Sequence, residues 1–193
     1  SGAFRTVEPP YGFERQGMRC GATSMENAHL RVDIDDDGTF SVLHKASGTA
    51  FEDLHVIEDD GEAGMAWMHH TPAYDEVVSS VGSPVSVKLM ENGPLVTSFE
   101  IAYRMLIPEG LEENGGDAWQ RLDGVGNNAK RSGNLVELVV RSQLILRKDA
   151  EALEVITRFN NAAKNHRLRV KFPTFRKTGS CATQCWSIHA IFC

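Results

Sequence analysis

Four basic side chains crowd into six positions near the end of the chain, within the sequence NNAAKNHRLRVKFPT. In this segment Arg167 and Arg169 alternate with apolar residues, which is the pattern of a half-buried strand with one cationic face. Such a face most commonly meets acids nearby, and otherwise it lines a cleft for a polar ligand. From these residues alone both interpretations stay open.

Acidic side chains gather in the sequence EDDGEAG, at Asp59, Asp60 and Glu62. A glycosidase needs two carboxyl groups on opposite sides of a sugar, and one short loop does not supply both. We therefore predict that these acids lie at the surface or form salt bridges, with Arg167 and Arg169 as candidate partners.

Aromatic and histidine side chains follow the acidic segment. Trp67 there, and Trp119 further along the chain, have flat apolar rings that suit either stacking on a pyranose or packing in a core or interface. His69 and His70 are adjacent, so on a strand they point to opposite faces and do not chelate one metal ion together. We interpret this histidine pair as the polar rim of a cleft.

Metal-binding patterns are incomplete. The cysteines Cys181, Cys185 and Cys193, with His189 between them, lack the paired C-x2-C spacing of structural zinc sites. The sequence DDDG at 35–38 begins like a calcium loop, but the remaining ligand positions do not follow. We assign no metal to this chain and interpret DDDG as a hairpin turn.

Alternating apolar residues predict the elements that position these groups. The clearest hairpins are 30–44, which turns at DDDG, and 85–107, which turns at NGP. A strand is expected around Leu54 to Ile57, followed by an acidic loop from Glu58 to Gly64. With about nine or ten strand candidates and no alternation of strands with helices, the predicted class is all-β, a large antiparallel β-sandwich.

Composition and motif content argue against several classes of function. The 193 residues carry a net charge of −6, which argues against a basic nucleic-acid surface. No apolar run is long enough to span a membrane, so we expect a soluble protein, located in the cytoplasm. There is no G-x-S-x-G elbow, H-E-x-x-H, phosphate-binding loop or dinucleotide fingerprint.

The domain organisation is expected to have three parts. Residues 1–24 form an extended lead-in from an upstream portion, and residues 25–174 form the sandwich. Within the sandwich, 108–133 is a polar, glycine-rich excursion of the kind that serves as a lid or stays flexible. The cysteine-rich tail, 175–193, is atypical and suggests a truncated or out-of-frame end.

Several segments together resemble a known family: VEPPYGF, SMENAHLRVDIDDDGTFSVLHKASGTAF, FEDLHVIEDDGEAGMAWMHHTP and TRFNNAAKNHRLRVKFPT. In sequence and order they are similar to the β-domain that follows the catalytic half of glycoside hydrolase family 38 α-mannosidases, in the bacterial branch that resembles mannosylglycerate hydrolases. The resemblance implies a supersandwich like that of galactose mutarotases. It also implies that the zinc ion and the catalytic residues belong to upstream portions, so that no catalytic or metal-binding residue lies in this chain.

The resemblance also implies roles for single residues. A family tyrosine that faces the active site aligns with Trp67, where this chain departs from the family. The strand with Arg167 and Arg169 lies where the β-domain meets the catalytic half, so either arginine reaches substrate or bridges domains. His69 and His70 complete the set of cleft or interface candidates.

The expected function is therefore to support the catalytic half of a zinc-dependent α-mannosidase-type glycosidase, which acts on a mannose-containing glycoside. Association of this chain into a homo-oligomer stays open. Two other functions remain open. An aldose epimerase of the mutarotase fold needs a histidine and a glutamate as acid and base, such as His69 or His166 with Glu100 or Glu137. A carbohydrate-binding or structural module would use its tryptophans as stacking platforms.

Overall fold

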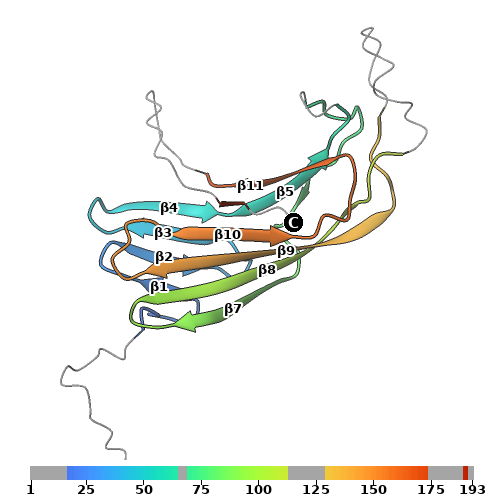
Figure 1. Ribbon diagram of the computed structural model, residues 1–193. Helices are drawn as coiled ribbons and strands as arrows, with labels where there is room; N and C mark the ends of the chain where they lie inside the picture. Colours follow the sequence, from blue (N-terminus) through green and yellow to red (C-terminus); the bar gives the residue numbers. More distant parts are fainter. Residues whose placement is uncertain (1–16, 65–68, 113–128, 174–188, 191–193) are drawn as a thin grey trace, which may run out of the picture.

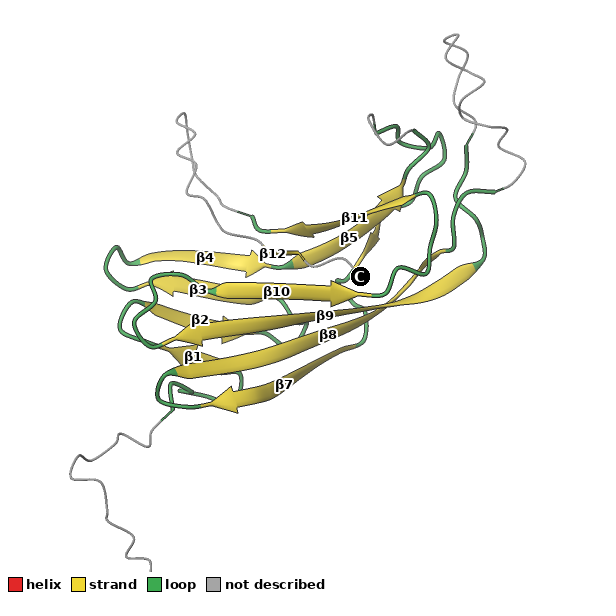
Figure 2. Cartoon of the chain, in the orientation of Figure 1, coloured by secondary structure: helices red, strands yellow, loops and turns green. Residues whose placement is uncertain are grey.

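The computed structural model describes residues 17–64, 69–112, 129–173 and 189–190. Every regular element in these ranges is a β-strand (Figures 1 and 2), which confirms the all-β class. The described part accordingly contains no helix of the length and apolarity that crossing a membrane requires. The predictions for the lead-in up to residue 16, for Trp67 and Trp119, and for the three C-terminal cysteines fall outside the described residues.

The first sheet is made of antiparallel hairpins. Its four strands, in spatial order, are β1 (Ser24–Glu26), β2 (Leu30–Ile34), β3 (Phe40–His44) and β4 (Thr49–Leu54). The predicted hairpin turn at DDDG joins β2 to β3. There the Asp37 carboxylate accepts hydrogen bonds from the backbone N–H and the hydroxyl of Thr39, at 2.9 and 2.7 Å. Asp37 is thus used to close its own turn, as expected for a hairpin.

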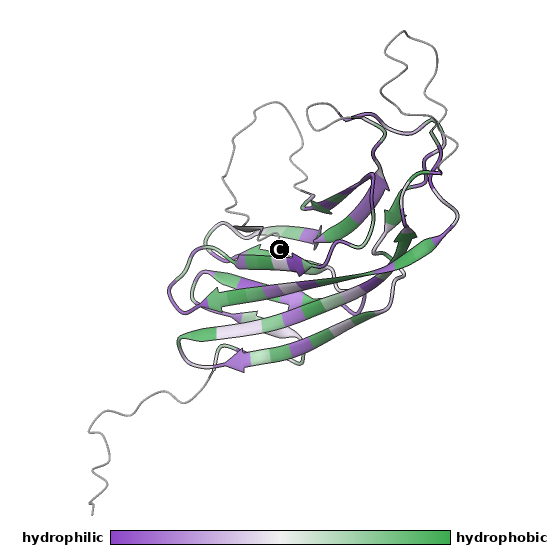
Figure 3. Cartoon of the chain, turned by 45° about the vertical axis from the view of Figure 1, so that its right-hand side comes forward, coloured by the Kyte–Doolittle hydropathy of each residue, from purple (hydrophilic) through white to green (hydrophobic). Residues whose placement is uncertain are grey.

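The second sheet carries the longest strands. In spatial order its members are β12 (His189–Ala190), β10 (Glu154–Phe159), β9 (Leu135–Arg147), β8 (Val96–Pro108) and β7 (Val85–Asn92). Strands β7 to β10 pair antiparallel, as predicted, and β12 pairs parallel to β10. Burial alternates along β9, where every second residue from Leu138 to Leu146 is buried. In both β8 and β9, runs of apolar residues are interrupted by polar ones, which appear as green and purple bands in Figure 3.

The third sheet is short and contains the cationic strand. Its members, in spatial order, are β11 (His166–Lys171), β5 (Val56–Gly61) and β6 (Val78–Ser79). Strand β5 continues from β4 after one residue, so the first and third sheets run on from each other and face β7–β10 across the core (Figure 1). Buried side chains from all three sheets form one hydrophobic core, including Phe40, Ile57 and Tyr103.

The acidic segment differs from the prediction. The expected loop from Glu58 to Gly64 is strand as far as Gly61, because β5 pairs residue by residue with β11. Asp60 lies directly opposite Arg167, and Glu58 lies directly opposite Arg169, and such cross-strand pairs stabilise a sheet. The high acidity that indicated a loop is therefore matched by a partner strand more than one hundred residues later in the chain.

The junction between β4 and β5 is a buried histidine, His55, with a left-handed backbone (φ 77°). Its ring packs among Phe40, Tyr103 and Phe172, with ring centroids 5.7 to 6.0 Å away. The Tyr103 hydroxyl donates its hydrogen to the Gly38 carbonyl oxygen at 2.5 Å, so His55 Nδ1, 3.2 Å from that hydroxyl, must be the donor. Burial lowers the pKa of His55 to about 4, and the ring is neutral at neutral pH.

Gly38 is where the β2–β3 turn meets this buried group, and its backbone has φ 83°. A Cβ atom there would lie 2.7 Å from the Tyr103 ring and from Val85. Gly48, in the β3–β4 turn, has φ 66°, but a Cβ atom added to it would meet nothing within 4 Å. Gly48 is therefore a matched control for the backbone effect alone.

We expect Gly48→Ala to lower the free energy of unfolding by about 1 kcal/mol, since an L-residue is disfavoured at positive φ. Gly38→Ala should lower it by about 2 kcal/mol, because crowding against Tyr103 adds to the backbone effect. Denaturant unfolding of both variants measures the difference. Equal losses would show that the contact between the turn and Tyr103 is not tight.

Candidate functional site

The outer face of the β5–β11 pair carries the cationic side chains predicted from the sequence. Arg167 binds the Asp60 carboxylate with two hydrogen bonds, of 3.0 Å from Nε and 2.6 Å from a terminal nitrogen. Arg169 reaches the same carboxylate at 2.8 Å, and Lys171 pairs with Glu58 at 2.5 Å. The predicted pairing of Arg167 and Arg169 with the acidic segment is therefore confirmed for Asp60.

Asp60 stays ionised in this arrangement. Burial acts to raise its pKa, but the hydrogen bond from Arg167 and the charges of Arg169 and Arg167 outweigh burial and lower it. The two arginine side chains remain 35% and 39% exposed. Because the Asp60 side chain is only 5% exposed, loss of its arginine partners would leave a buried carboxylate without its counter-charge.

The inner face of the same strand pair holds a second charge cluster, centred on Asp59, which is completely buried. One carboxylate oxygen of Asp59 accepts a hydrogen bond from Arg131, and the other lies 2.5 Å from Nδ1 of His166. Arg131 also donates to the backbone carbonyl oxygens of Asp59 and Glu76, at 3.2 and 2.9 Å. Asp59 thus joins β5 to β11 and to a residue that lies just before β9.

Several loops meet around this cluster, at the end of the molecule where β5 stops (Figure 1). We call the described residues 61–64, 69–77, 109–112, 129–133 and 160–165 the loop end. Backbone hydrogen bonds connect its segments directly: Glu62 N–H to Asn165 O at 2.8 Å, and Lys164 N–H to Glu109 O at 2.9 Å. The loop end is therefore a connected surface whose parts come from distant places in the sequence.

Both ends of the predicted excursion belong to the loop end. Leu111 forms an antiparallel bridge with Arg131, and the backbone N–H of Ser132 donates to Gly110 O at 2.9 Å. Residues 113–128, with Trp119, lie outside the described residues. The described ends of the excursion therefore lie side by side, and Arg131 binds them to β5 through Asp59.

The Glu62 carboxylate connects the described residues on either side of 65–68. It accepts hydrogen bonds from the backbone N–H groups of Gly64 and His70, at 2.7 and 3.0 Å, and from the His69 ring. Burial acts to raise the pKa of Glu62, but these hydrogen bonds outweigh it and lower the pKa. His69 is thereby oriented by a carboxylate, and His70 is exposed. Trp67, which comes two residues before His69, lies outside the described residues.

The histidines and glutamates that an epimerase would require are not brought together. His69 pairs with Glu62 and His166 with Asp59. Glu100 and Glu137 form ion pairs with arginines on the outer face of the second sheet. Each of the four groups therefore has a different partner from the one that the epimerase interpretation needs.

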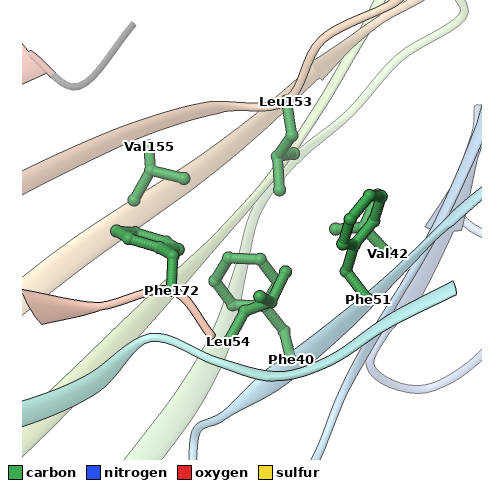
Figure 4. A pocket seen from close by; sticks show the side chains of 7 residues that line it. All are labelled: Phe40, Val42, Phe51, Leu54, Leu153, Val155 and Phe172. Atoms are coloured by element: carbon green, nitrogen blue, oxygen red, sulfur yellow. The ribbon is translucent and has the colours of Figure 1, made fainter. Parts of the chain in front are cut away.

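A cavity between β3, β4 and β10 offers no polar group to a sugar. Its lining side chains are all apolar (Figure 4): Phe40, Val42, Phe51, Leu54, Leu153, Val155 and Phe172. Sugar sites need convergent hydrogen-bonding groups as well as apolar surface. Nor do the described residues hold a group of three or more histidine, cysteine or acidic side chains placed to bind a metal ion. Among these residues, polar groups converge at the loop end.

Sequence reasoning missed Arg131 at this end, and it did not identify Asp59 as the partner of His166. Arg131 lies in a polar stretch without periodicity, so nothing in the sequence connects it with Asp59. His166 was grouped with the basic side chains of this segment, but alternation along β11 puts it on the face opposite Arg167, together with Leu168. That pattern is the one sequence signal for the inner cluster.

The chain has relatives among glycoside hydrolases. It is 28% identical over 158 residues to a candidate mannosylglycerate hydrolase of Halalkalibacterium halodurans. The aligned residues make up 81% of this chain and 18% of that protein. It superposes on an α-mannosidase from Enterococcus faecalis V583 with a TM-score of 0.78 and 28% identity, over 84% of this chain and 19% of the other. No protein-family profile matches the chain.

A second Enterococcus faecalis structure, of a protein in glycosyl hydrolase family 38, also has a TM-score of 0.78, with 27% identity over 87% of this chain and 20% of the other. The chain therefore spans about one fifth of the length of the relatives that it matches. The resemblance expected from the quoted segments is confirmed: in sequence and fold, this chain is similar to one β-sandwich portion of family 38 α-mannosidases.

Proposed function

We propose that this chain is the non-catalytic β-sandwich portion of an α-mannosidase-type glycoside hydrolase. The observation that carries the proposal is the match of most of this chain, at a TM-score of 0.78, to about one fifth of an α-mannosidase. A catalytic half would supply the reacting groups and a zinc ion, in the cytoplasm. This sandwich would support that half and help to wall its sugar cleft, as part of a fold like that of galactose mutarotases.

The loop end and the adjoining outer face of β5–β11 are the surfaces that we assign to this role. Arg167 and Arg169 use part of their hydrogen-bonding capacity on Asp60, while more than a third of each side chain stays exposed. Exposed guanidinium groups held in a fixed position suit carboxylates on a partner surface or hydroxyl groups of a sugar. His69, His70 and Trp67 would border the same cleft, and the substrate would be a mannose-containing glycoside.

The isolated chain is expected to hydrolyse no aryl α-mannoside and to bind no stoichiometric zinc, because the proposal puts both functions in another part of the enzyme. Release of the aryl group and metal content after dialysis measure the two, with the Enterococcus faecalis α-mannosidase as the positive control. Robust turnover by the purified chain would refute the proposal.

Two further readouts separate the other functions in the same samples. Faster mutarotation of glucose or galactose would identify an epimerase. Sugar-dependent quenching of tryptophan fluorescence without turnover would identify a carbohydrate-binding module.

A further inference from the structure

A histidine in the loop end bridges a hydroxyl group and a carboxylate. Nε2 of His69 lies 3.3 Å from the hydroxyl oxygen of Thr71, and Nδ1 of the same ring binds one carboxylate oxygen of Glu62. The order hydroxyl, imidazole, carboxylate activates a hydroxyl group as the nucleophile of acyl transfer. Such a group is identified by its geometry and not by its place in the sequence.

Glu62 decides which nitrogen of the His69 ring carries the hydrogen. Burial acts to raise the pKa of Glu62, but hydrogen bonds from the backbone of His70, the ring of His69 and the backbone of Gly64 outweigh burial and lower it. An ionised carboxylate only accepts hydrogen bonds, so Nδ1 of His69 is the donor. When this is the one hydrogen on the ring, Nε2 carries the lone pair and can accept the proton of the Thr71 hydroxyl.

Charged neighbours also act on this group. Asp60 is close enough to His69 for their charges to interact, and Arg167 interacts in the same way with Glu62. Asp60 and Arg167 carry opposite charges and bind each other through two hydrogen bonds, so their effects on the ring oppose each other. Glu62, in direct contact, is therefore the group that orients the His69 ring and stabilises the positive charge on it after it takes up a proton.

The hydroxyl group can be reached from solvent, while its two partners are mostly covered. Thr71 is exposed, and the side chains of His69 and Glu62 are 28% and 24% exposed. The backbone also fixes the segment, because the N–H of Ala63 donates to the carbonyl oxygen of His70 at 2.8 Å. A reagent that approaches Thr71 therefore meets a hydroxyl group whose base is already in position.

We propose that Glu62, His69 and Thr71 form a nucleophilic site, at which activated esters acylate the Thr71 hydroxyl. The hydroxyl oxygen bonds to the carbonyl carbon of the ester, and its proton passes to Nε2 of His69. The bond from that carbon to the leaving oxygen then breaks, and the leaving group takes the electron pair and the proton from His69. The products are an acylated Thr71 and a free alcohol or phenol, in a reaction separate from glycoside hydrolysis.

The chain contains its own control for the role of the carboxylate. At the β3–β4 turn, Nδ1 of His44 lies 2.7 Å from the hydroxyl oxygen of Ser47, which is exposed. Among the described residues, no carboxylate binds the His44 ring. The Ser47 hydroxyl thus has a histidine partner but lacks the orienting acid, and as a primary alcohol it is the less hindered of the two nucleophiles.

Brief exposure of the unmodified chain to p-nitrophenyl acetate at neutral pH tests the proposal. Mass spectrometry of fragments should show acetylation of Thr71 about tenfold or more faster than that of Ser47, since a positioned base contributes a factor of about 100 or more. Equal rates at the two hydroxyl groups, or no acetyl group on Thr71, would overturn the proposal.

Glu62→Gln tests the carboxylate itself. The amide oxygen can still accept the N–H groups of Gly64 and His70, but the charge that orients and stabilises the ring is gone. Acetylation of Thr71 should slow by about tenfold or more, while the rate at Ser47 stays the same and shows that the rest of the chain is intact. An unchanged rate at Thr71 would refute the role of Glu62 and with it the proposal.

Two substitutions at Thr71 check where the acetyl group is attached. Thr71→Val removes the hydroxyl group at nearly constant volume and should abolish the modification, whereas Thr71→Ser keeps a hydroxyl group and should remain acetylated. Acetylation of this segment that persists in Thr71→Val would place the acetyl group on another residue and contradict the proposal.

Discussion

Replacing Asp59 with asparagine is expected to lower the free energy of unfolding by about 3 to 5 kcal/mol, the range for breaking a buried ion pair. The carboxylate is fully buried, and the Arg131 side chain that it binds is 4% exposed. Without the negative charge, the buried guanidinium group of Arg131 would lose the carboxylate that it binds directly. Denaturant unfolding at neutral pH measures the loss.

The matched control is Glu137→Gln on the outer face of the second sheet. Glu137 pairs with Arg104 at 3.3 Å, but the two side chains are 50% and 62% exposed. Water screens such a pair, so this variant should lose less than about 1 kcal/mol. Similar losses for the two variants would contradict the structural role that we assign to Asp59.

Acid should destabilise the protein through His55, well before the carboxylates are fully protonated. Burial lowers the pKa of His55 to about 4 in the folded protein, from the ordinary value of 6.5 that applies in an unfolded chain. Between these values the unfolded chain binds more protons than the folded one, so stability falls as the pH drops. The difference corresponds to a loss of about 3 kcal/mol from this residue between pH 6.5 and pH 4.

Denaturant unfolding across this pH range, compared between the unmodified chain and His55→Phe, isolates the effect. Phenylalanine has a similar volume and does not titrate, so this variant should lack most of the slope, whatever its stability at neutral pH. His70→Phe, which changes an exposed histidine, is the control and should keep the slope. A slope that persists in His55→Phe would assign the acid sensitivity to other groups.

Local pattern was sufficient for much of the fold. The alternation in β11 predicted its strand, its cationic face and its apolar face, because side chains in a strand point alternately to two sides. The turn at Gly38 was likewise predicted, since its sequence carries the glycine that positive φ requires. Where residues close in sequence determine the local structure, the sequence was sufficient to predict the strand or the turn.

Partners far apart in the sequence decided the rest. The segment from Glu58 to Gly61 is acidic enough to indicate a loop, and it forms a strand because β11 offers matching bases. Arg131 gives no local sign that it reaches the buried carboxylate of Asp59. His55 occupies a left-handed position that a β-sheet propensity does not predict, and its neutral ring follows from the aromatic side chains around it.

The candidate site was predicted only in part. The sequence identified Arg167, Arg169, His69 and His70, and the structure places them on or beside the loop end, with partners for Arg167, Arg169 and His69. What it did not provide was the inner cluster beneath them. Because that cluster joins β5 and β11 to Arg131, near the end of the excursion, only the folded chain reveals it.

The most direct test of the central claim is a structure of the full-length gene product that carries this sequence, with a mannoside bound. The account predicts a catalytic half next to the sandwich, with the loop end and the Arg167 face bordering the sugar cleft. A bound sugar far from both surfaces, or a gene product that consists of this sandwich alone, would contradict it.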